Sequence, residues 1–441
     1  MNDPLEIEPI PGFVNALVTV PGSKSITNRA LLIAASATGE TELSGVLFAD
    51  DTVAMVGALE ALGAVLDVNE ARRQIRVRRG IDWDRVPAGV SLDAIESGTS
   101  SRFLVAAAAL GEVPIIVDGR PSIRVRPIGD LVDALRHLGA TVRTASAADT
   151  VSETGDSDGS NPSLPLSVDG AGMSGGTVSL RGDASSQFLS ALMMIGPHLI
   201  DGLRIELTTP LVSRPYVVMT AAVMESFGAT ATLTGSERVQ VDAGHYNAAN
   251  YRIEPDASAA SYFFAAAAVC GGRVRIDGLG TNSLQGDLRF VELLGEMGAD
   301  VTIADDYSEV VRRGPLHGIE ADLADCSDIA PTIAVVAGTA VGESRFTGIG
   351  FIRRKESDRV GGVVAELQRC GVEANEEPDG FTIVPRPIRA ATFETYGDHR
   401  MAMSFAILGL AHPGMRIAGP ECVAKTYPDF FEDLDQLRPN T

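Results

Sequence analysis

A pattern of apolar residues followed by glycine recurs along the chain and limits the folds that it can adopt. Each copy has an apolar stretch with helical spacing, then Leu, Phe, Met or Cys, then Gly and small or β-branched residues. Gly at this place suits a left-handed helix C-cap, and the residues after it favour a short strand. The copies occupy residues 58–65, 134–142, 224–230, 293–301 and 367–372.

A second pattern alternates with the first and recurs roughly every 70 to 85 residues. A small polar turn leads each time into an Ala- and Leu-rich helix with few charges, and such a helix is buried on all sides. The spacing is too long for a solenoid, so we expect small folded units of strands and two helices, with three buried parallel helices in each half. The six copies begin at or near Pro21, Ser97, Asp183, Asp256, Cys326 and Gly397.

Composition excludes several classes of protein. The 441 residues suffice for two or three domains, and a net charge of −22 argues against nucleic-acid or membrane partners. The four cysteines have no CxxC spacing and the six histidines form no pair typical of a metal site. The acidic N-terminus lacks the apolar segment of a signal peptide, and no apolar run is long enough to span a membrane. We therefore expect a cytoplasmic enzyme without a metal.

The first helix start, residues 21–29, combines features of an anion site. A strand-like run ends at Pro21, and we expect Ser25 or Thr27 to cap the helix that follows. Lys24 and Arg29 add positive charge to the free N–H groups of a helix N-terminus. An ordinary capped helix with two surface cations is the alternative. The segment lacks the glycines of a Walker A loop.

Arginines and lysines gather at the other polar turns, where they suit the binding of carboxylate and phosphate groups. One turn differs from the rest: the first half of the Ser- and Gly-rich segment 145–176 is predicted to be a mobile surface loop. Domain junctions are expected near Pro21 and near Glu254, where strands end at proline. The charged turns are Ser97–Arg102, Arg124–Pro127, Ser185–Gln187, Ser213–Tyr216, Arg353–Arg359, Asp398–Arg400 and Lys425–Pro428.

These turns together resemble the 5-enolpyruvylshikimate-3-phosphate synthase family of enolpyruvyl transferases over nearly the whole chain. The resemblance implies an α/β fold of two domains, an inverse α/β barrel with six βαβαββ repeats, three in each domain. The domains would comprise residues 23–254, and 1–22 plus 255–441, with a cleft and a two-strand hinge between them. The motifs are Pro21–Arg29, Ser97–Arg102, Arg126–Ile128, Ser185–Phe188, Ser213–Tyr216, Lys355–Arg359, Asp398–Met403 and Lys425–Asp429.

The implied reaction transfers the enolpyruvyl group of phosphoenolpyruvate to the 5-hydroxyl of shikimate 3-phosphate, by addition and elimination through a tetrahedral intermediate. The family needs no metal or organic cofactor, and a monomer is expected. Asp328 matches the base for the hydroxyl, Glu356 the acid and base at the methylene carbon, and Lys24 a general acid at the phosphate, with His399 in a supporting role.

The resemblance also assigns binding residues for both substrates. For shikimate 3-phosphate these are Ser25, Arg29, Ser185, Ser186, Gln187, Ser213, Tyr216, Asp328 and Lys355. For phosphoenolpyruvate they are Lys24, Gly98, Arg126, Gln187, Arg359, Arg400 and Lys425. For Asp328 a helix cap is the alternative role, and for Glu356 it is an ion pair with Arg353, Arg359 or Lys355.

The chain departs from the family pattern at three positions. Glu96 stands where many members have Asn, and a carboxylate there needs a cation beside it. Phe351 and Ile352 replace polar residues, so a contact with shikimate 3-phosphate is expected to be lost. Gly98 retains the close backbone approach to phosphoenolpyruvate, which predicts inhibition by glyphosate.

Two other functions stay open at this point. The sister enzyme that acts on UDP-N-acetylglucosamine typically has a reactive Cys in the loop before the Arg-Pro pair, and residues 119–126 contain none. A non-catalytic anion-binding protein could use the same helix starts. The presence of Lys24, Asp328 and Glu356 together argues against it.

Overall fold

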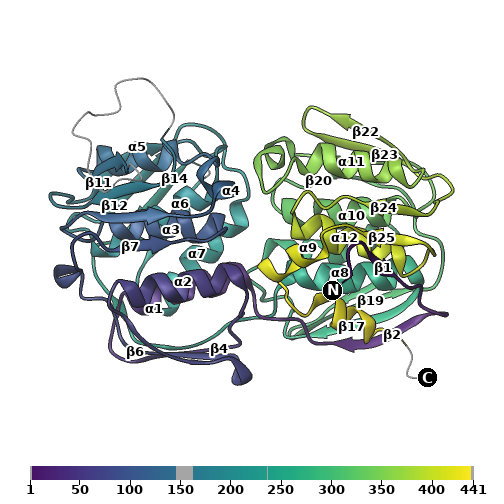
Figure 1. The fold of residues 1–441 in the computed structure, drawn as a ribbon, viewed down its shortest axis with the longest axis horizontal. Helices are drawn as coiled ribbons and strands as arrows, with labels where there is room; N and C mark the ends of the chain where they lie inside the picture. The colour runs from purple at the N-terminus through teal and green to yellow at the C-terminus, as the bar shows by residue number, and fades with distance from the viewer. Residues whose placement is uncertain (1, 146–161, 236, 439–441) are drawn as a thin grey trace. The chain divides into compact units, whose positions relative to one another are not determined.

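The computed structural model describes residues 2–145, 162–235 and 237–438. The predicted mobile loop in the first half of segment 145–176 lies almost wholly outside the described residues. The chain forms two compact units, Gly22–Ile253 and Met1–Pro21 with Glu254–Thr441. Both combine helices with mixed sheets, so the predicted α/β class is confirmed in this coarse form (Figure 1).

The described part of unit Gly22–Ile253 contains three four-stranded sheets and one strand pair. In each larger sheet, one edge strand pairs in parallel with its neighbour and the remaining pairs are antiparallel. The sheets are β16(Asn250–Arg252)-β4(Thr41–Ser44)-β6(Gln74–Arg79)-β5(Val65–Asn69), β7(Ser91–Asp93)-β8(Ile115–Asp118)-β10(Leu166–Asp169)-β9(Thr141–Thr144) and β11(Gly176–Leu180)-β12(Leu203–Leu207)-β14(Arg238–Val241)-β13(Ala231–Thr234), and the pair is β15(Tyr246–Asn247)-β3(Ala37–Thr38).

The helices of this unit differ in burial as their sequences predict. The apolar helices α1(Lys24–Ala35), α3(Gly98–Ala108) and α6(Ser186–Ile195) are buried along nearly their whole length, and α3 packs against α6. The other helices are α2(Asp50–Ala61), α4(Pro121–Arg124), α5(Gly129–His137) and α7(Arg214–Ser226), with 3₁₀ turns at Glu70–Arg72, Trp83–Arg85 and Gly196–His198.

The other unit has the same mixture of elements in its described residues. Its buried helices α8(Ala257–Cys270), α10(Ala330–Ala337) and α12(His399–Gly409) contact one another inside one hydrophobic core (Figure 1). Its sheets are β18(Asp300–Ile303)-β19(Tyr307–Arg312)-β17(Gly272–Asp277)-β2(Val14–Val18), β20(Glu320–Asp322)-β21(Ser344–Thr347)-β23(Gly380–Val384)-β22(Glu373–Glu377) and β1(Leu5–Ile7)-β25(Met415–Ile417)-β24(Ala391–Phe393). The remaining helices are α9(Arg289–Glu296), α11(Arg359–Arg369) and α13(Phe430–Asp435), with 3₁₀ turns at Gly286–Leu288, Ser327–Ile329, Gly350–Arg354 and Pro420–Lys425.

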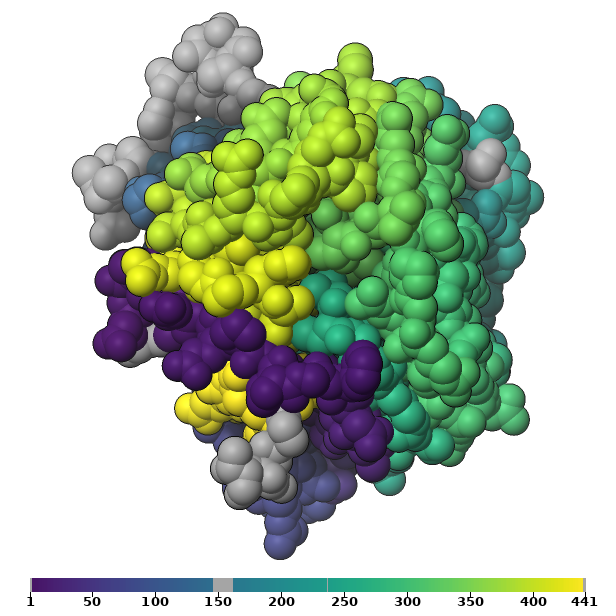
Figure 2. Space-filling model, turned by 90° about the vertical axis from the view of Figure 1, so that its right-hand side faces the viewer, coloured from purple at the N-terminus to yellow at the C-terminus, as the bar shows by residue number. Residues whose placement is uncertain are grey.

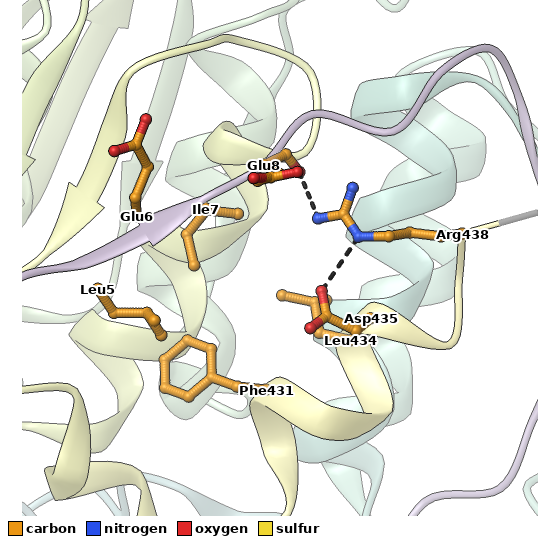
Figure 3. A pocket seen from close by; sticks show the side chains of 8 residues that line it. All are labelled: Leu5, Glu6, Ile7, Glu8, Phe431, Leu434, Asp435 and Arg438. Atoms are coloured by element: carbon orange, nitrogen blue, oxygen red, sulfur yellow. Dashed lines mark hydrogen bonds and ion pairs between the residues drawn. The ribbon is translucent and has the colours of Figure 1, made fainter. Parts of the chain in front are cut away.

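Described residues near the N-terminus and near the C-terminus lie together in this unit. Strand β1 pairs antiparallel with β25, so the N-terminal segment lies against C-terminal residues (Figure 2). A pocket of about 280 Å³ lies between β1 and α13, with Phe431 and Leu434 on one side and Arg438 beside Asp435 (Figure 3). It shares no residue with the charged cluster described below.

Helix ends agree with the sequence in one respect and differ in another. The glycines after the five apolar segments, Gly63, Gly139, Gly228, Gly298 and Gly371, all have positive φ, which confirms their predicted left-handed conformation. The predicted cap of α1 is wrong, because Ser23, and not Ser25 or Thr27, accepts the hydrogen bond from the Ile26 N–H. The helix begins earlier than its apolar pattern indicates.

Within the described residues, none of the helices has both the length and the apolar character needed to cross a membrane.

Burial of His198 predicts a pH-dependent stability. Burial lowers the pKa of His198 from 6.5 to about 4, and the charge of His245 adds to this. The unfolded chain therefore binds a proton that the folded chain excludes, and stability falls as pH decreases through 6.5 toward 4. From pH 7.5 to 5 this group is expected to remove about 2 kcal/mol from the free energy of unfolding.

The variant His198→Phe keeps a ring beside Tyr246, 5.6 Å from it in the native protein, and removes the titrating group. Urea unfolding at the two pH values should show a smaller loss in this variant than in the native protein. His137→Gln, which changes an exposed histidine, should keep the native loss. Equal losses in all three proteins would contradict the prediction.

Candidate active site

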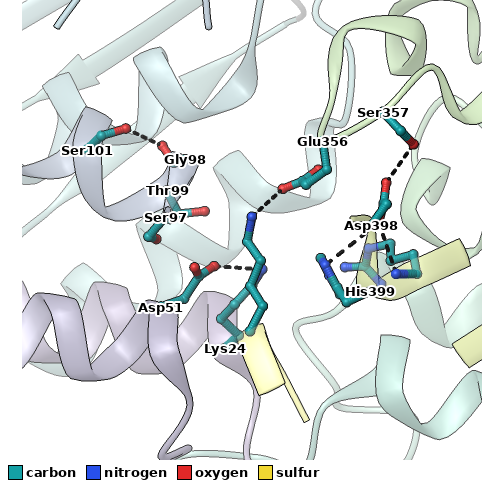
Figure 4. Close-up of polar contacts among 12 residues, drawn as sticks. Lys24, Asp51, Ser97, Gly98, Thr99, Ser101, Glu356, Ser357, Asp398 and His399 are labelled. Carbon is teal, nitrogen blue, oxygen red and sulfur yellow. Dashed lines mark hydrogen bonds and ion pairs between the residues drawn. The ribbon is translucent and has the colours of Figure 1, made fainter. Parts of the chain in front are cut away.

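The start of α1 holds Lys24 beside a carboxylate that the sequence did not single out. Lys24 is the first residue of the helix, directly after the cap Ser23. Its Nζ lies 3.1 Å from Oδ2 of Asp51, which is buried at the start of α2 (Figure 4). The pair of acidic residues before Thr52 was a visible signal for a helix start, but local sequence could not connect it with Lys24.

Arg29 is buried, 1% exposed, among neutral oxygen atoms. Its guanidinium donates to the Thr220 hydroxyl at 2.7 Å, to the Ser190 hydroxyl at 3.1 Å and to the Ser25 carbonyl at 2.8 Å. Its carbon Cζ lies 5.9 Å from the centre of the Tyr216 ring. Burial lowers the pKa of Arg29 to about 10, so the group is still cationic at neutral pH.

Gly98 and Arg126 come together at the start of α3. A Cβ on Gly98 would lie 2.5 Å from Nη1 of Arg126 and 2.9 Å from Nη1 of Arg102. Arg102 donates to the Gly98 carbonyl at 2.8 Å. Gln187, in the first turn of α6, donates to the Thr99 hydroxyl at 3.1 Å, which connects the two helix starts. The absence of a side chain on Gly98 therefore leaves the room that two guanidinium groups occupy.

Three predicted serines also lie at helix starts. Ser185 caps α6 and accepts from the Gln187 N–H at 3.2 Å, and Ser186 is the first residue of that helix. Ser213 precedes α7 with φ of 53°, a left-handed conformation that is uncommon for serine. Tyr216 is in the first turn of α7.

Substitution of Gly98 by Ala is expected to displace Arg126. A new methyl group at 2.5 Å from a guanidinium nitrogen costs about 1–3 kcal/mol unless the arginine moves. We expect the KM for an anionic substrate bound at this helix start to rise about tenfold and kcat to change less, as steady-state kinetics would measure. Gly57→Ala is a matched control, because its Cβ would have no atom within 4 Å. An unchanged KM in Gly98→Ala would contradict the prediction.

In the other unit, Asp328 accepts hydrogen bonds from two arginines. Its Oδ1 lies 3.0 Å from Nη1 of Arg359, and its Oδ2 lies 2.7 Å from Nη2 of Arg400. Asp328 is in the 3₁₀ turn before α10, and the cap residue of that helix is Ile329, so the alternative role of helix cap is wrong. Burial alone would raise the pKa of Asp328, but Arg400, Lys355 and Arg359 outweigh it and hold the pKa well below its ordinary value.

Arg359 connects Asp328 with two further carboxylates. It donates to Oε2 of Glu356 at 2.8 Å and to Oδ2 of Asp398 at 2.8 Å. The other oxygen of Glu356 lies 3.5 Å from Nζ of Lys425. Burial opposes the charge on Arg359, but the carboxylates of Asp398, Glu356 and Asp328 outweigh it and raise the pKa of Arg359. Of the ion-pair partners considered for Glu356, the structure gives Arg359, and it adds Lys425.

Asp398 organises the start of α12. It caps the helix by accepting from the Arg400 N–H at 2.9 Å, and it accepts from the Ser357 hydroxyl at 3.0 Å (Figure 4). His399 is buried with its Nδ1 3.7 Å from Asp398. The motif therefore places a carboxylate, an imidazole and a guanidinium within one helical turn.

The positions that depart from the family pattern have local partners. The Nζ of Lys355 lies 5.8 Å from the centre of the Phe351 ring, and Ile352 is fully buried. Glu96 lies 3.7 Å from Arg120 in an exposed ion pair, which supplies the cation that its carboxylate needs. Such exposed pairs contribute little to stability.

Sequence reasoning missed one buried acid near this cluster. Asp287 is buried in the 3₁₀ turn Gly286–Leu288 and accepts a hydrogen bond from Ser258. Burial, and then the charge of Asp328, raise the pKa of Asp287 to about 7. The only signal for Asp287 in the sequence is its position between two apolar segments. In the described ranges, no group of three or more His, Cys, Asp or Glu side chains could hold a metal ion.

Comparison with known proteins places these residues in a family. The family model described as EPSP synthase (3-phosphoshikimate 1-carboxyvinyltransferase) matches residues 10–434. The protein of that name from Nostoc punctiforme is 42% identical over 437 residues, which cover 99% of each chain. The one from Shewanella loihica is 38% identical and covers 98% of this chain and 99% of its own.

Solved structures agree with the sequence comparison. EPSP synthase from Acinetobacter baumannii superposes with a TM-score of 0.81 at 25% identity, over 99% of this chain and 98% of that one. The enolpyruvyl transferase NikO from Streptomyces tendae has the same fold, with a TM-score of 0.75 at 18% identity over 99% and 98% of the two chains. The resemblance inferred from the charged turns is confirmed, and this chain belongs to the EPSP synthase (3-phosphoshikimate 1-carboxyvinyltransferase) family.

Proposed function

We propose that the chain transfers the enolpyruvyl group of phosphoenolpyruvate to the 5-hydroxyl of shikimate 3-phosphate and releases phosphate, as a 3-phosphoshikimate 1-carboxyvinyltransferase. The observation that carries this is the Asp328–Arg359–Glu356 cluster in a chain of this family. It combines two carboxylates for proton transfer with cations for an anionic substrate. The reaction belongs to the biosynthesis of aromatic amino acids.

In the proposed addition step, the 5-hydroxyl oxygen bonds to C2 of phosphoenolpyruvate and its proton passes to Asp328. Glu356 gives a proton to the methylene carbon, which becomes a methyl group in the tetrahedral intermediate. In the elimination step Glu356 takes a proton back, the C2–O bond to phosphate breaks, and Lys24 donates to the leaving phosphate. General acid–base steps of this kind typically contribute about 10²–10⁴-fold each.

The electrostatics of Asp328 fit a base that substrate binding activates. Without substrate, three cations hold its pKa low, so it is ionised but weakly basic. Phosphate and carboxylate groups bound to Arg359, Arg400 and Lys355 would offset those charges and raise the pKa of Asp328. The base would therefore become effective only when both anions are bound.

The proposed binding roles follow the family. Arg29 and Tyr216 would hold shikimate 3-phosphate with Ser25, Ser185, Ser186, Gln187, Ser213, Asp328 and Lys355. Gly98 and Arg126 would hold phosphoenolpyruvate with Lys24, Gln187, Arg359, Arg400 and Lys425. The roles are divided between the two units, so the proposal requires both sets to act on one pair of substrates.

We extend the proposal to organisation and location. The domains would be 23–254 and 1–22 plus 255–441, each an inverse α/β barrel of three repeats, with a two-strand hinge and a cleft. The parallel-edged sheets that recur in both units support the repeats. A cytoplasmic monomer is proposed by analogy with the family, and the four free cysteines agree with a reducing compartment.

Phosphate release from phosphoenolpyruvate, measured with each acceptor, tests the function. Release should require shikimate 3-phosphate and ignore UDP-N-acetylglucosamine. The reverse preference would favour the sister enzyme, and no release with either would favour an anion-binding protein. Glyphosate in the millimolar range should inhibit the release, and unaffected turnover would reject that part of the proposal.

A further inference from the structure

A tight turn of unusual backbone conformation precedes α12 and places Asp398 and Arg400 beside Arg359 and Asp328. The Asp398 N–H donates to the Thr395 carbonyl at 2.8 Å, which closes a turn of four residues. Its two central residues, Tyr396 and Gly397, have φ of 56° and 66°, as in a type I′ turn. This conformation suits Gly397 but costs a residue such as tyrosine about 1–2 kcal/mol. Other contacts must therefore hold Tyr396 in place.

The phenol of Tyr396 reaches a buried carboxylate on α11. Its hydroxyl donates to Oε1 of Glu366 at 2.7 Å, although the tyrosine is itself 49% exposed and Glu366 is fully buried. The second oxygen of Glu366 accepts from the Glu394 N–H at 3.1 Å. One carboxylate thus holds Glu394, directly before the turn, and Tyr396, inside the turn.

Two features of α11 fit this role. Gly362 lies under the Tyr396 ring, because a Cβ there would be 3.3 Å from Cε2 of Tyr396 and 3.3 Å from Cε of Met401. Met401 directly follows Arg400, so Gly362 of α11 lies close to one residue inside the turn, Tyr396, and to one residue after it, Met401. Arg359, seven residues before Glu366 and therefore about 10 Å away along the helix, binds Asp398 at 2.8 Å. Helix α11 therefore holds the turn at two separated places.

The remaining neighbours leave the hydroxyl as a neutral donor. Arg369 donates to Oε2 of Glu366 at 2.8 Å from a partly exposed position and is the cation that faces the carboxylate. Burial, and then the hydrogen bond to Glu366, raise the pKa of Tyr396 to about 12. The contact is therefore a hydrogen bond from a neutral hydroxyl to a carboxylate that Arg369 also binds.

We propose that Tyr396 and Glu366 are positioning residues, which hold the start of α12 so that Arg400 is fixed where phosphoenolpyruvate binds. The inference rests on the proposed function, because it takes the binding role of Arg400 from there. Neither residue touches the Asp328–Arg359–Glu356 cluster by a hydrogen bond in the described structure, so they act through the turn. Loss of the contact should move Arg400 and leave the acid–base groups in place.

The variant Tyr396→Phe removes the hydroxyl alone and is the central test. We expect the KM for phosphoenolpyruvate to rise at least about fivefold, with kcat and the KM for shikimate 3-phosphate changed less than twofold. Glu366→Gln keeps an oxygen for the Glu394 N–H and an amide group that can donate to the phenol oxygen, so its KM for phosphoenolpyruvate should rise less than in Tyr396→Phe. The rise in Glu366→Ala should exceed that in Tyr396→Phe. Tyr307→Phe removes a hydroxyl elsewhere in the same unit and is the control.

A phosphoenolpyruvate KM in Tyr396→Phe equal to the native value would overturn the proposal, and so would equal rises in both KM values. A lowered melting temperature with native kinetics would also overturn it, since the contact would then be structural only. If Glu366→Ala does not fold, Tyr396→Phe and Glu366→Gln still decide. The native enzyme is assayed in parallel, and its activity alone tests the proposed function. The positioning role is tested separately, by the ratio of each variant's KM to the native KM.

Discussion

Replacement of Glu356 by Gln is expected to lower kcat by about 10²–10⁴-fold while both substrates still bind. The amide keeps the size of the side chain and one oxygen for Arg359, at 2.8 Å in the native protein, although the contact of Lys425 with the second oxygen, at 3.5 Å, is lost. It cannot donate a proton to the methylene carbon and take it back. Pre-steady-state phosphate release and equilibrium binding of each substrate would separate the two effects.

The matching change at Asp328 differs in one physical respect. Asp328→Ala removes the proposed base but also leaves Arg359 and Arg400 without their shared carboxylate, so anion binding should be retained or tighter. We expect turnover to fall as far as in Glu356→Gln. Glu376→Gln, which changes an exposed partner of Arg353, should keep native turnover and is the control. Equal losses of binding and turnover in either variant would indicate structural roles.

The features that local sequence can specify were predicted well. The nearly all-apolar, uncharged composition of α8 and α10 predicts burial on every side, and both helices are buried. The glycines after the apolar segments predict left-handed caps because few other residues tolerate positive φ, and Gly63 and Gly371 have φ of 99° and 94°. The family could be recognised because the combination of charged turns is specific to it.

The features that depend on long-range contacts could not be predicted. Arg29 donates to Thr220, 191 residues away, and nothing near either residue indicates the pairing. Asp51 and Lys24 form an ion pair because two helix starts converge in the folded chain. The pKa of Asp287 is raised mainly by burial, which only the folded chain creates. The cap of α1 was misplaced by two residues because Ser23, Ser25 and Thr27 are all chemically able to cap a helix.

The second large effect is expected at Arg29, where binding and stability should change in opposite directions. Its guanidinium is buried among hydroxyl and carbonyl oxygens, and burial lowers its pKa from 12.5 to about 10. The folded state therefore holds the charge less favourably than the unfolded state does. At neutral pH this costs the unliganded protein about 3 kcal/mol, an upper figure since hydrogen bonds offset part of it.

Arg29→Met keeps the length of the apolar stem and removes the charge. The hydroxyls of Thr220 and Ser190 remain bonded to each other at 2.9 Å, so few polar groups lose their only partner. We expect a melting temperature equal to or above that of the native protein, measured without ligands. Affinity for shikimate 3-phosphate should fall by about 10²-fold or more, because a buried cation is the strongest attraction for its anionic groups.

Arg204→Met, on the exposed face of β12, is the matched control and should change neither property. A lower melting temperature in Arg29→Met would mean that the hydrogen bonds of the guanidinium outweigh its desolvation in the free protein. Native affinity would mean that Arg29 has no part in binding. The expected combination, a protein at least as stable that no longer binds, would identify Arg29 as a residue kept for its ligand at a cost in stability.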